Sequence, residues 1–166
     1  IAINLSAIQL QQISLIADIQ TIIMETGCSI RDIEFEVAAT VFASDNYTIH
    51  DNLFNISKLG IAITVDNFGQ DIPVFHFIEP LGINKFKISK DYIQHLPGQL
   101  IGTALIQSVM TLSRELGIDV VGEGIENEQQ EAFLRANQIV TGQGHHQAKP
   151  MKVSEATFHL RCHKKK

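Results

Sequence analysis

The sequence lacks the residues and patterns that would assign it to several common classes of protein. It has no Trp, 2 Cys and 4 Pro among 166 residues. Cys28 and Cys162 are far apart and form no CxxC pair, so neither a disulfide framework nor a zinc site is predicted, and a reducing cytoplasm is the expected compartment. No apolar run reaches ~18 residues, so no membrane-spanning helix is predicted.

Positive charge is also sparse. The net charge is −5 and no basic stripe occurs, which argues against a duplex nucleic acid as partner. The basic run at residues 164–166 is typical of a solvated terminus. The chain opens at Ile1 within an apolar stretch and without a signal peptide, so we expect a fragment of a longer protein.

Two familiar enzyme motifs are absent as well. No GxSxG sequence occurs, which argues against a hydrolase with a nucleophile elbow. No Gly-rich phosphate loop follows the first predicted strand, and Gly122-Glu123-Gly124 is too short and too late in the chain to serve as one.

Short, β-branched apolar segments alternate with longer segments of helical periodicity. The predicted strands are residues 1–4, 33–37, 61–65, 83–88, 118–121 and 139–141. The predicted helices are residues 9–25, 48–59, 100–116 and 128–136, a turn at 73–78 and a last helix capped by Ser154. This alternation indicates an α/β domain with a parallel sheet, either open and doubly wound or part of an eight-stranded barrel.

Polar residues follow or end every predicted strand. In both architectures, function lies at the carboxyl ends of the strands. Oxygen ligands suit Mg²⁺ or Mn²⁺, and a lysine suits a phosphate, so these residues together predict a divalent-metal site for a phosphate ester. The alternative is that they are ordinary turn and cap residues. The polar residues at or near the predicted strand ends are Asn4, Glu34, Glu36, Asp66, Asn67, Lys87, Glu123, Glu126 and Gln143.

Six segments carry a resemblance to a known family through their order and spacing. They are Asn4-Leu5-Ser6, Ile33-Glu34-Phe35-Glu36-Val37, Asp66-Asn67-Phe68-Gly69, Phe86-Lys87-Ile88, Val120-Val121-Gly122-Glu123-Gly124-Ile125-Glu126, and Gln143-Gly144 with Pro150. Together they resemble the EAL domain family of cyclic di-GMP phosphodiesterases. The resemblance implies that residues 1–166 form a single EAL-like domain, an incomplete TIM-like (β/α) barrel of about six β/α units whose N-terminal strands are missing.

The resemblance also implies roles for individual residues. Active members hydrolyse cyclic di-GMP to linear pGpG with two divalent cations. The implied metal ligands are Asn4, Glu36 and Asp66, the implied catalytic residues are Glu123 and Lys87, and the implied ligand-binding residues are Gln143, Glu126 and Asn67.

Several departures from the family pattern favour loss of hydrolysis. The Glu-Ala-Leu segment that should precede Asn4 is absent, and Asn67 replaces the second metal aspartate, so Mg²⁺ or Mn²⁺ binding should be weakened. Ala39 replaces a glutamate that anchors the loop after Asp-Phe-Gly in active members, and Ser89 replaces an aspartate. The loop itself, residues 70–74, has a different sequence with an inserted proline.

Three hypotheses about function remain open at this stage. The favoured one is a non-catalytic cytoplasmic module that senses cyclic di-GMP or binds a protein partner. The alternative is an active metal-dependent phosphodiesterase whose missing segment lies upstream. The third is a structural dimerisation domain, since an incomplete barrel exposes strand edges that need cover.

Overall fold

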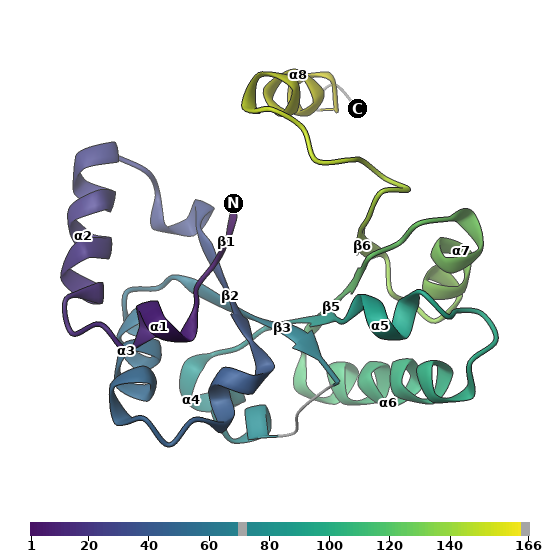
Figure 1. Cartoon of the computed structure of the whole chain (residues 1–166), viewed down its shortest axis with the longest axis horizontal. Coiled ribbons are helices and arrows are strands. Elements are labelled where there is room, and N and C mark those ends of the chain that lie inside the picture. The colour runs from purple at the N-terminus through teal and green to yellow at the C-terminus, as the bar shows by residue number, and fades with distance from the viewer. Residues whose placement is uncertain (70–72, 164–166) are drawn as a thin grey trace.

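A curled sheet of six parallel strands organises the chain (Figure 1), and the computed structural model describes residues 1–69 and 73–163. The strands lie in sequence order, which makes the sheet an incomplete TIM-like barrel, open along one side. They are β1 (Ala2–Asn4), β2 (Glu34–Ala38), β3 (Ala62–Phe68), β4 (Lys85–Ile88), β5 (Asp119–Glu123) and β6 (Thr141–Gln143).

Helices connect the strands and lie mainly outside the curl (Figure 1). The α-helices are α1 (Ala7–Leu10), α2 (Leu15–Thr26), α3 (Tyr47–Lys58), α4 (Ile78–Leu81), α5 (Lys90–Ile93), α6 (Leu100–Leu116), α7 (Glu128–Ala136) and α8 (Val153–His163). The short 3₁₀ helices are η1 (Ile30–Asp32), η2 (Ala39–Ala43) and η3 (Pro73–Phe77). Within the described residues, no helix is both long and apolar enough to span a bilayer.

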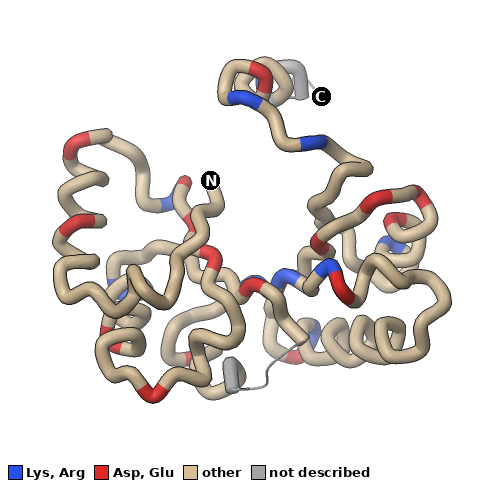
Figure 2. The backbone as a smooth tube through the Cα atoms, in the orientation of Figure 1, with Lys and Arg blue, Asp and Glu red and all other residues tan. Residues whose placement is uncertain are grey.

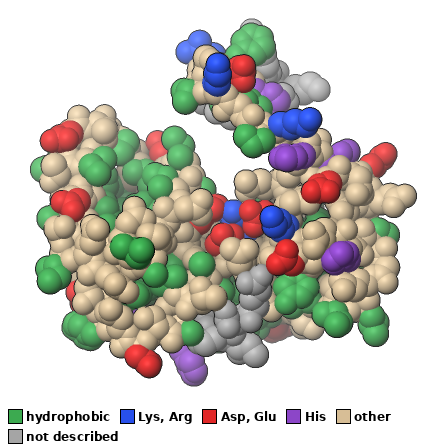
Figure 3. Space-filling model, viewed as in Figure 1, with side chains coloured by type: hydrophobic (Ala, Val, Ile, Leu, Met, Phe, Trp, Pro, Cys, Tyr) green, Lys and Arg blue, Asp and Glu red, His purple; other side chains and the backbone are tan. Residues whose placement is uncertain are grey.

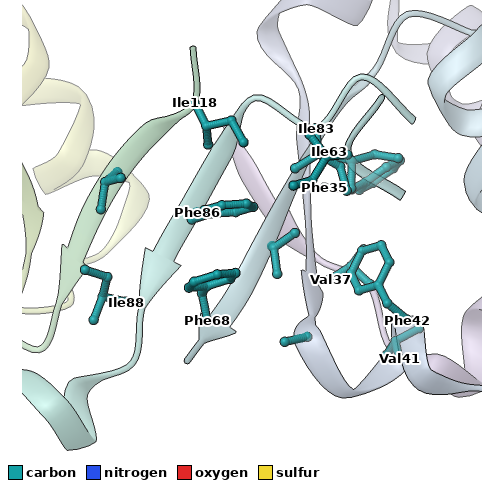
Figure 4. Close-up of a cluster of buried hydrophobic side chains, with 14 of the residues drawn as sticks. Phe35, Val37, Val41, Phe42, Ile63, Phe68, Ile83, Phe86, Ile88 and Ile118 are labelled. Carbon is teal, nitrogen blue, oxygen red and sulfur yellow. The ribbon is translucent and has the colours of Figure 1, made fainter. Parts of the chain in front are cut away.

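Alternation along the central strands separates the core from the concave face of the sheet. In β2, Phe35 and Val37 are buried, and they alternate with partly exposed Glu34 and Glu36. Because successive side chains of a strand point to opposite faces, the apolar set packs against the helices and the polar set points into the curl. Figure 4 shows the apolar side, where the rings of Phe68 and Phe86 stack with centroids 4.2 Å apart.

The single helix predicted over residues 9–25 is wrong in one respect: it is interrupted in the structure, where α1 ends at Leu10 and α2 begins at Leu15. Buried Asn52 of α3 donates from Nδ2 to the carbonyl oxygens of Leu10 and Gln12, both at 2.9 Å. A side chain distant in sequence therefore satisfies carbonyls that a continuous helix would have used.

Other elements also differ from the prediction. The last strand is residues 141–143 rather than 139–141, because the amide of Ile139 donates to the carbonyl of Leu134 at the end of α7. Helix α5 was not predicted, and α8 begins at Val153, so Ser154 lies inside its first turn. Residues 70–72 of the altered loop and the basic tail at 164–166 lie outside the described residues.

Candidate metal and phosphate site

A lysine surrounded by carboxylates occupies the concave face at the carboxyl ends of four adjacent strands. Lys87 Nζ lies 2.8 Å from Glu36 Oε2, 3.6 Å from Asp66 Oδ1 and 3.9 Å from Glu123 Oε1. The Lys87 side chain is only 5% exposed. The sheet therefore brings together four of the residues selected from the sequence, in one cluster of mixed charge.

The electrostatics of this cluster follow from its burial and its composition. Burial by itself would lower the pKa of Lys87, but the hydrogen bond to Glu36 and the charges of Asp66 and Glu123 raise it above its ordinary value. Burial raises the pKa of Glu123, and the charges of Asp66 and Glu36 raise it further, against the opposing effect of Lys87. Lys87 thus stays charged, while Glu123 holds its proton more tightly than a free glutamate does.

Glu34 does not belong to this cluster, contrary to the expectation that it would share the same edge of the sheet. It stands at the start of β2, where it pairs with Lys85 and accepts a 2.7 Å hydrogen bond from Thr64 Oγ1. Burial opposes ionisation here, but the hydrogen bonds from Lys85 and Thr64 hold the pKa of Glu34 below its ordinary value. Glu34 and Glu36 point into the same curl in successive layers.

Asn67 is the extra residue of a β-bulge. Val65 and Phe68 of β3 pair with Phe86 and Ile88 of β4, so three steps on one strand match two on the other. Asn67 has a φ of 56°, a left-handed conformation that Asn and Asp tolerate better than most residues. The bulge lets Asp66 point into the curl while Phe68 still packs in the core.

The side chain of Asn67 bonds to Asp66 instead of joining the carboxylate cluster. Its Nδ2 donates to Asp66 Oδ2 at 3.1 Å. The other oxygen, Asp66 Oδ1, is buried; among the described residues it has no hydrogen-bond partner, and the Lys87 ammonium lies 3.6 Å from it. An acceptor that is buried and unsatisfied is costly unless a cation compensates it. The ammonium of Lys87 supplies part of that compensation from beyond hydrogen-bond distance, and Asn67 fixes the orientation of Asp66.

The donor set suits a hard cation, although the carboxylates are not arranged to enclose one. Asn4 is in register with Glu36 on the neighbouring strand, so an amide oxygen stands beside the carboxylates. Across the described part of the chain, no three His, Cys, Asp or Glu side chains form a metal-binding group. Glu36, Asp66 and Glu123 are instead gathered around the ammonium of Lys87.

A cavity of about 670 Å³ adjoins the cluster, between the ends of β5 and β6 and helix α8. Glu123, Glu126 and Gln143, selected from the sequence, all contribute to its wall. Lys90 also lines it and was missed by sequence analysis, although it stands three residues after Lys87. Figure 2 shows acidic and basic residues close together along the backbone near the middle of the sheet, and Figure 3 shows acidic and basic side chains gathered where the surface is hollowed.

Close packing brings Lys90 to this cavity. Gly124 has a φ of +76°, and a Cβ built there would lie 2.5 Å from Lys90 Cβ. Only glycine allows α5 to approach the end of β5 so closely. The charge of Lys90 lowers the pKa of Glu123, against the raising effect of burial.

The comparison with known protein families agrees with this geometry. A model described as "EAL domain" matches residues 1–150. The chain belongs to the EAL domain family. A signalling protein of Caulobacter vibrioides is 32% identical over 158 residues, covering 95% of this chain and 20% of that protein. The cyclic di-GMP phosphodiesterase NbdA of Pseudomonas aeruginosa is 24% identical over 164 residues, covering 99% of this chain and 21% of that protein. The chain thus spans about a fifth of the length of these relatives.

Solved EAL structures share the fold. The PaMucR phosphodiesterase in complex with c-di-GMP superposes with a TM-score of 0.86 at 24% identity, covering 93% of this chain and 63% of that one. The EAL domain of Mycobacterium smegmatis DcpA superposes with a TM-score of 0.85 at 24% identity, covering 96% of this chain and 72% of that one. These matches establish the EAL fold for the six-stranded sheet.

Two departures from the EAL pattern have local structural roles here. Ser89 is buried and caps α5, because its Oγ accepts from the amide of Asp91 at 3.3 Å. Ala39 is 1% exposed at the start of η2 and offers no side-chain hydrogen bond. Neither residue can supply the carboxylate that the family resemblance led us to expect.

Proposed function

We propose that this EAL domain is a regulatory module that binds cyclic di-GMP with a divalent cation and hydrolyses it negligibly. The observation that carries this function is the pairing of Lys87 with Glu36, Asp66 and Glu123 in a buried cluster. The ammonium of Lys87 already neutralises part of the negative charge of the three carboxylates, which two bound cations would otherwise neutralise. Three carboxylates to one ammonium still leave an excess of negative charge, so the cluster would hold a phosphate only together with a cation.

Asn67 supports the same conclusion. An amide at this position is neutral and donates to Asp66, so it cannot bridge two cations. Asn4, Glu36 and Asp66 would hold one cation, and Lys87 and Lys90 would face a phosphate. When bound, the cation would neutralise phosphate charge and favour ionisation of a nearby water. Gln143 and Glu126, on the cavity wall, would contact the nucleotide.

A second candidate, an active phosphodiesterase, is favoured by one feature. Within the described part of the chain, the buried Oδ1 of Asp66 accepts no hydrogen bond and has only the Lys87 ammonium at 3.6 Å, which would leave it able to bind a metal. Glu123, with its raised pKa, could exchange a proton with water near the phosphate. Turnover distinguishes this candidate from the binding module.

We also infer that residues 1–166 act as one EAL-type domain in the cytoplasm, with a protein partner or a second copy as neighbour. Cys28 is exposed and free, which suits a reducing compartment. The outer strands β1 and β6 are each paired on one side only within the described sheet, which suits contact with another chain.

Titration calorimetry with cyclic di-GMP, with and without Mn²⁺, tests this function alongside an assay for pGpG. Binding that requires Mn²⁺, without turnover, is expected. Glu36→Gln should abolish the binding, and Glu34→Gln, two residues earlier on the same strand, should leave it unchanged. Steady Mn²⁺-dependent release of pGpG would establish the second candidate, and absence of binding in every condition would leave only protein interaction.

A further inference from the structure

The end of β3 carries Asp66 and is irregular, so something must hold it in place. The bulge at Asn67 is followed by Gly69, whose φ is +109°. Asp66 still pairs with Ala38 of β2, and pairing with β4 resumes at Phe68, so the irregular backbone is confined to Asn67 and to Gly69 beyond the strand. Contacts made by Gly69 therefore limit how far this strand end can shift relative to its neighbours.

Tyr92 of α5 makes such a contact. Its hydroxyl donates to the carbonyl oxygen of Gly69 at 2.9 Å, in a partly buried setting. The ring itself packs closely, since a Cβ built on Gly69 would lie 3.0 Å from Tyr92 Cε2 and 2.9 Å from Leu105 Cδ2. Gly69 is thus enclosed between α5 and α6, and its carbonyl oxygen accepts a hydrogen bond from the Tyr92 hydroxyl.

Helix α5 also touches the ends of the two neighbouring strands. It follows β4 directly, with Ser89 as its cap, only two residues after Lys87. Lys90 packs against Gly124 at the end of β5. One short helix therefore contacts the segments that carry Asp66, Lys87 and Glu123, so a shift of α5 would move all three groups relative to one another.

We propose that Tyr92 is the positioning residue that anchors the end of β3 in this chain, in place of the carboxylate that Ala39 lacks. The hydroxyl of Tyr92 holds Gly69, and through it Asn67 and Asp66, in place at the end of β3, where Asp66 would act as a cation ligand under the proposed function. This role rests on the proposed function for its consequence, cation affinity, but the anchor itself does not depend on any ligand.

Tyr92→Phe tests the anchor because it removes one oxygen and keeps the ring. Tyr47→Phe is the matched control, since Tyr47 is the chain's other tyrosine and is 79% exposed. Amide hydrogen exchange over residues 66–69 of the metal-free protein should speed up by about 3- to 10-fold in Tyr92→Phe, the loss expected for one partly buried hydrogen bond. It should be unchanged in Tyr47→Phe. Equal exchange in both variants would overturn the anchor.

The positioning role has its own measurement. Mn²⁺ affinity, followed by the loss of the free-ion paramagnetic resonance signal, should fall by about 3- to 10-fold in Tyr92→Phe with little change in melting temperature. A lower melting temperature with unchanged Mn²⁺ affinity would show a merely structural role and overturn the proposal. If the wild-type chain binds no Mn²⁺, the proposed function and the positioning role both fail, while the exchange data still report on the anchor.

Discussion

Lys87 dominates the site at the scale of single residues. Removing an ammonium and three carboxylates from water is costly, and the cost is recovered only through their mutual attraction. The attraction to the ammonium is strongest for Glu36, because its oxygen lies closest, whereas Glu123 is the most distant of the three carboxylates. Burial raises the pKa of Glu123, and the charges of Asp66 and Glu36 add to the rise, so the opposing effects of Lys87 and Lys90 do not cancel it.

The raised pKa of Glu123 predicts a pH dependence of stability. The folded chain keeps this proton to a higher pH than the unfolded chain, whose glutamate titrates near the ordinary value of 4.5. Stability therefore falls as pH rises from that value through the folded-state pKa. Glu123→Gln should remove this fall and raise the free energy of unfolding at neutral pH. Urea denaturation of metal-free protein across this range checks it, with exposed Glu126→Gln as control; parallel curves for Glu123→Gln and wild type would contradict it.

Asn67→Asp should give the site the second carboxylate that the amide of Asn67 does not supply. A second carboxylate beside Asp66 should raise Mn²⁺ affinity by about 10-fold. The same change should lower the melting temperature of the metal-free chain, because two adjacent carboxylates repel and the 3.1 Å hydrogen bond to Asp66 is lost. Calorimetry and thermal denaturation measure these two effects.

A matched control for that substitution lies on α3. Asn55 Nδ2 donates to Asp51 Oδ2, also at 3.1 Å, far from the site in sequence. Asn55→Asp should leave Mn²⁺ affinity unchanged. An equal gain of affinity in both variants would mean that added charge alone, without the geometry of the bulge, attracts the cation.

At the scale of elements, short helices and their caps hold the strand ends that carry the site. Gln130 in the first turn of α7 is 2% exposed and forms a capping box with Asn127. Its Oε1 also accepts from the amide of Glu126 at 2.7 Å, and its Nε2 donates to the carbonyl of Gln94 at 3.4 Å. One amide therefore ties the segment after β5 to the end of α5.

Gln130→Ala should cost about 2 kcal/mol of unfolding free energy, because it removes a cap and leaves buried backbone groups unsatisfied. Chemical denaturation measures the loss. The adjacent Gln129 is exposed, so Gln129→Ala should change stability by no more than about 0.5 kcal/mol. Equal unfolding free energies of the two variants would show that the Gln130 cap does not stabilise the fold.

At the scale of the whole molecule, β1 and β6 are the outer strands of the described sheet. Strand β1 pairs with β2 alone among the described strands, and its Ile3 is 45% exposed. An edge strand with an exposed isoleucine is a template for another chain. We expect the sedimentation coefficient of this chain to rise with concentration, and Ile3→Lys to suppress the rise by placing a charge on the edge.

Ile13→Lys is the control for this effect, since Ile13 is 93% exposed and lies between α1 and α2, away from the sheet edge. It should associate as the wild-type chain does. Circular dichroism verifies that both variants fold. A wild-type chain that sediments as a monomer at every concentration would remove the basis for a role of β1 in assembly.

The sequence by itself determined the order of the strands and of the longer helices, and it selected four residues that the sheet brings into one cluster. Period-two alternation in segments such as β2, and carboxylates at the ends of successive strands, are local signals that follow from backbone geometry. Because the carboxyl ends of parallel strands meet at one edge, the sequence is enough to place Glu36, Asp66, Lys87 and Glu123 together.

Only the tertiary structure decided how those groups interact. Periodicity carries no information about the bulge that turns Asn67 toward Asp66, or about the contact that brings Tyr92 to Gly69, 23 residues earlier in the chain. It likewise could not separate Glu34 from Glu36, or show that Asn52 interrupts the first helix. Each of these depends on the distance between segments remote in sequence, which is a property of packing rather than of local pattern.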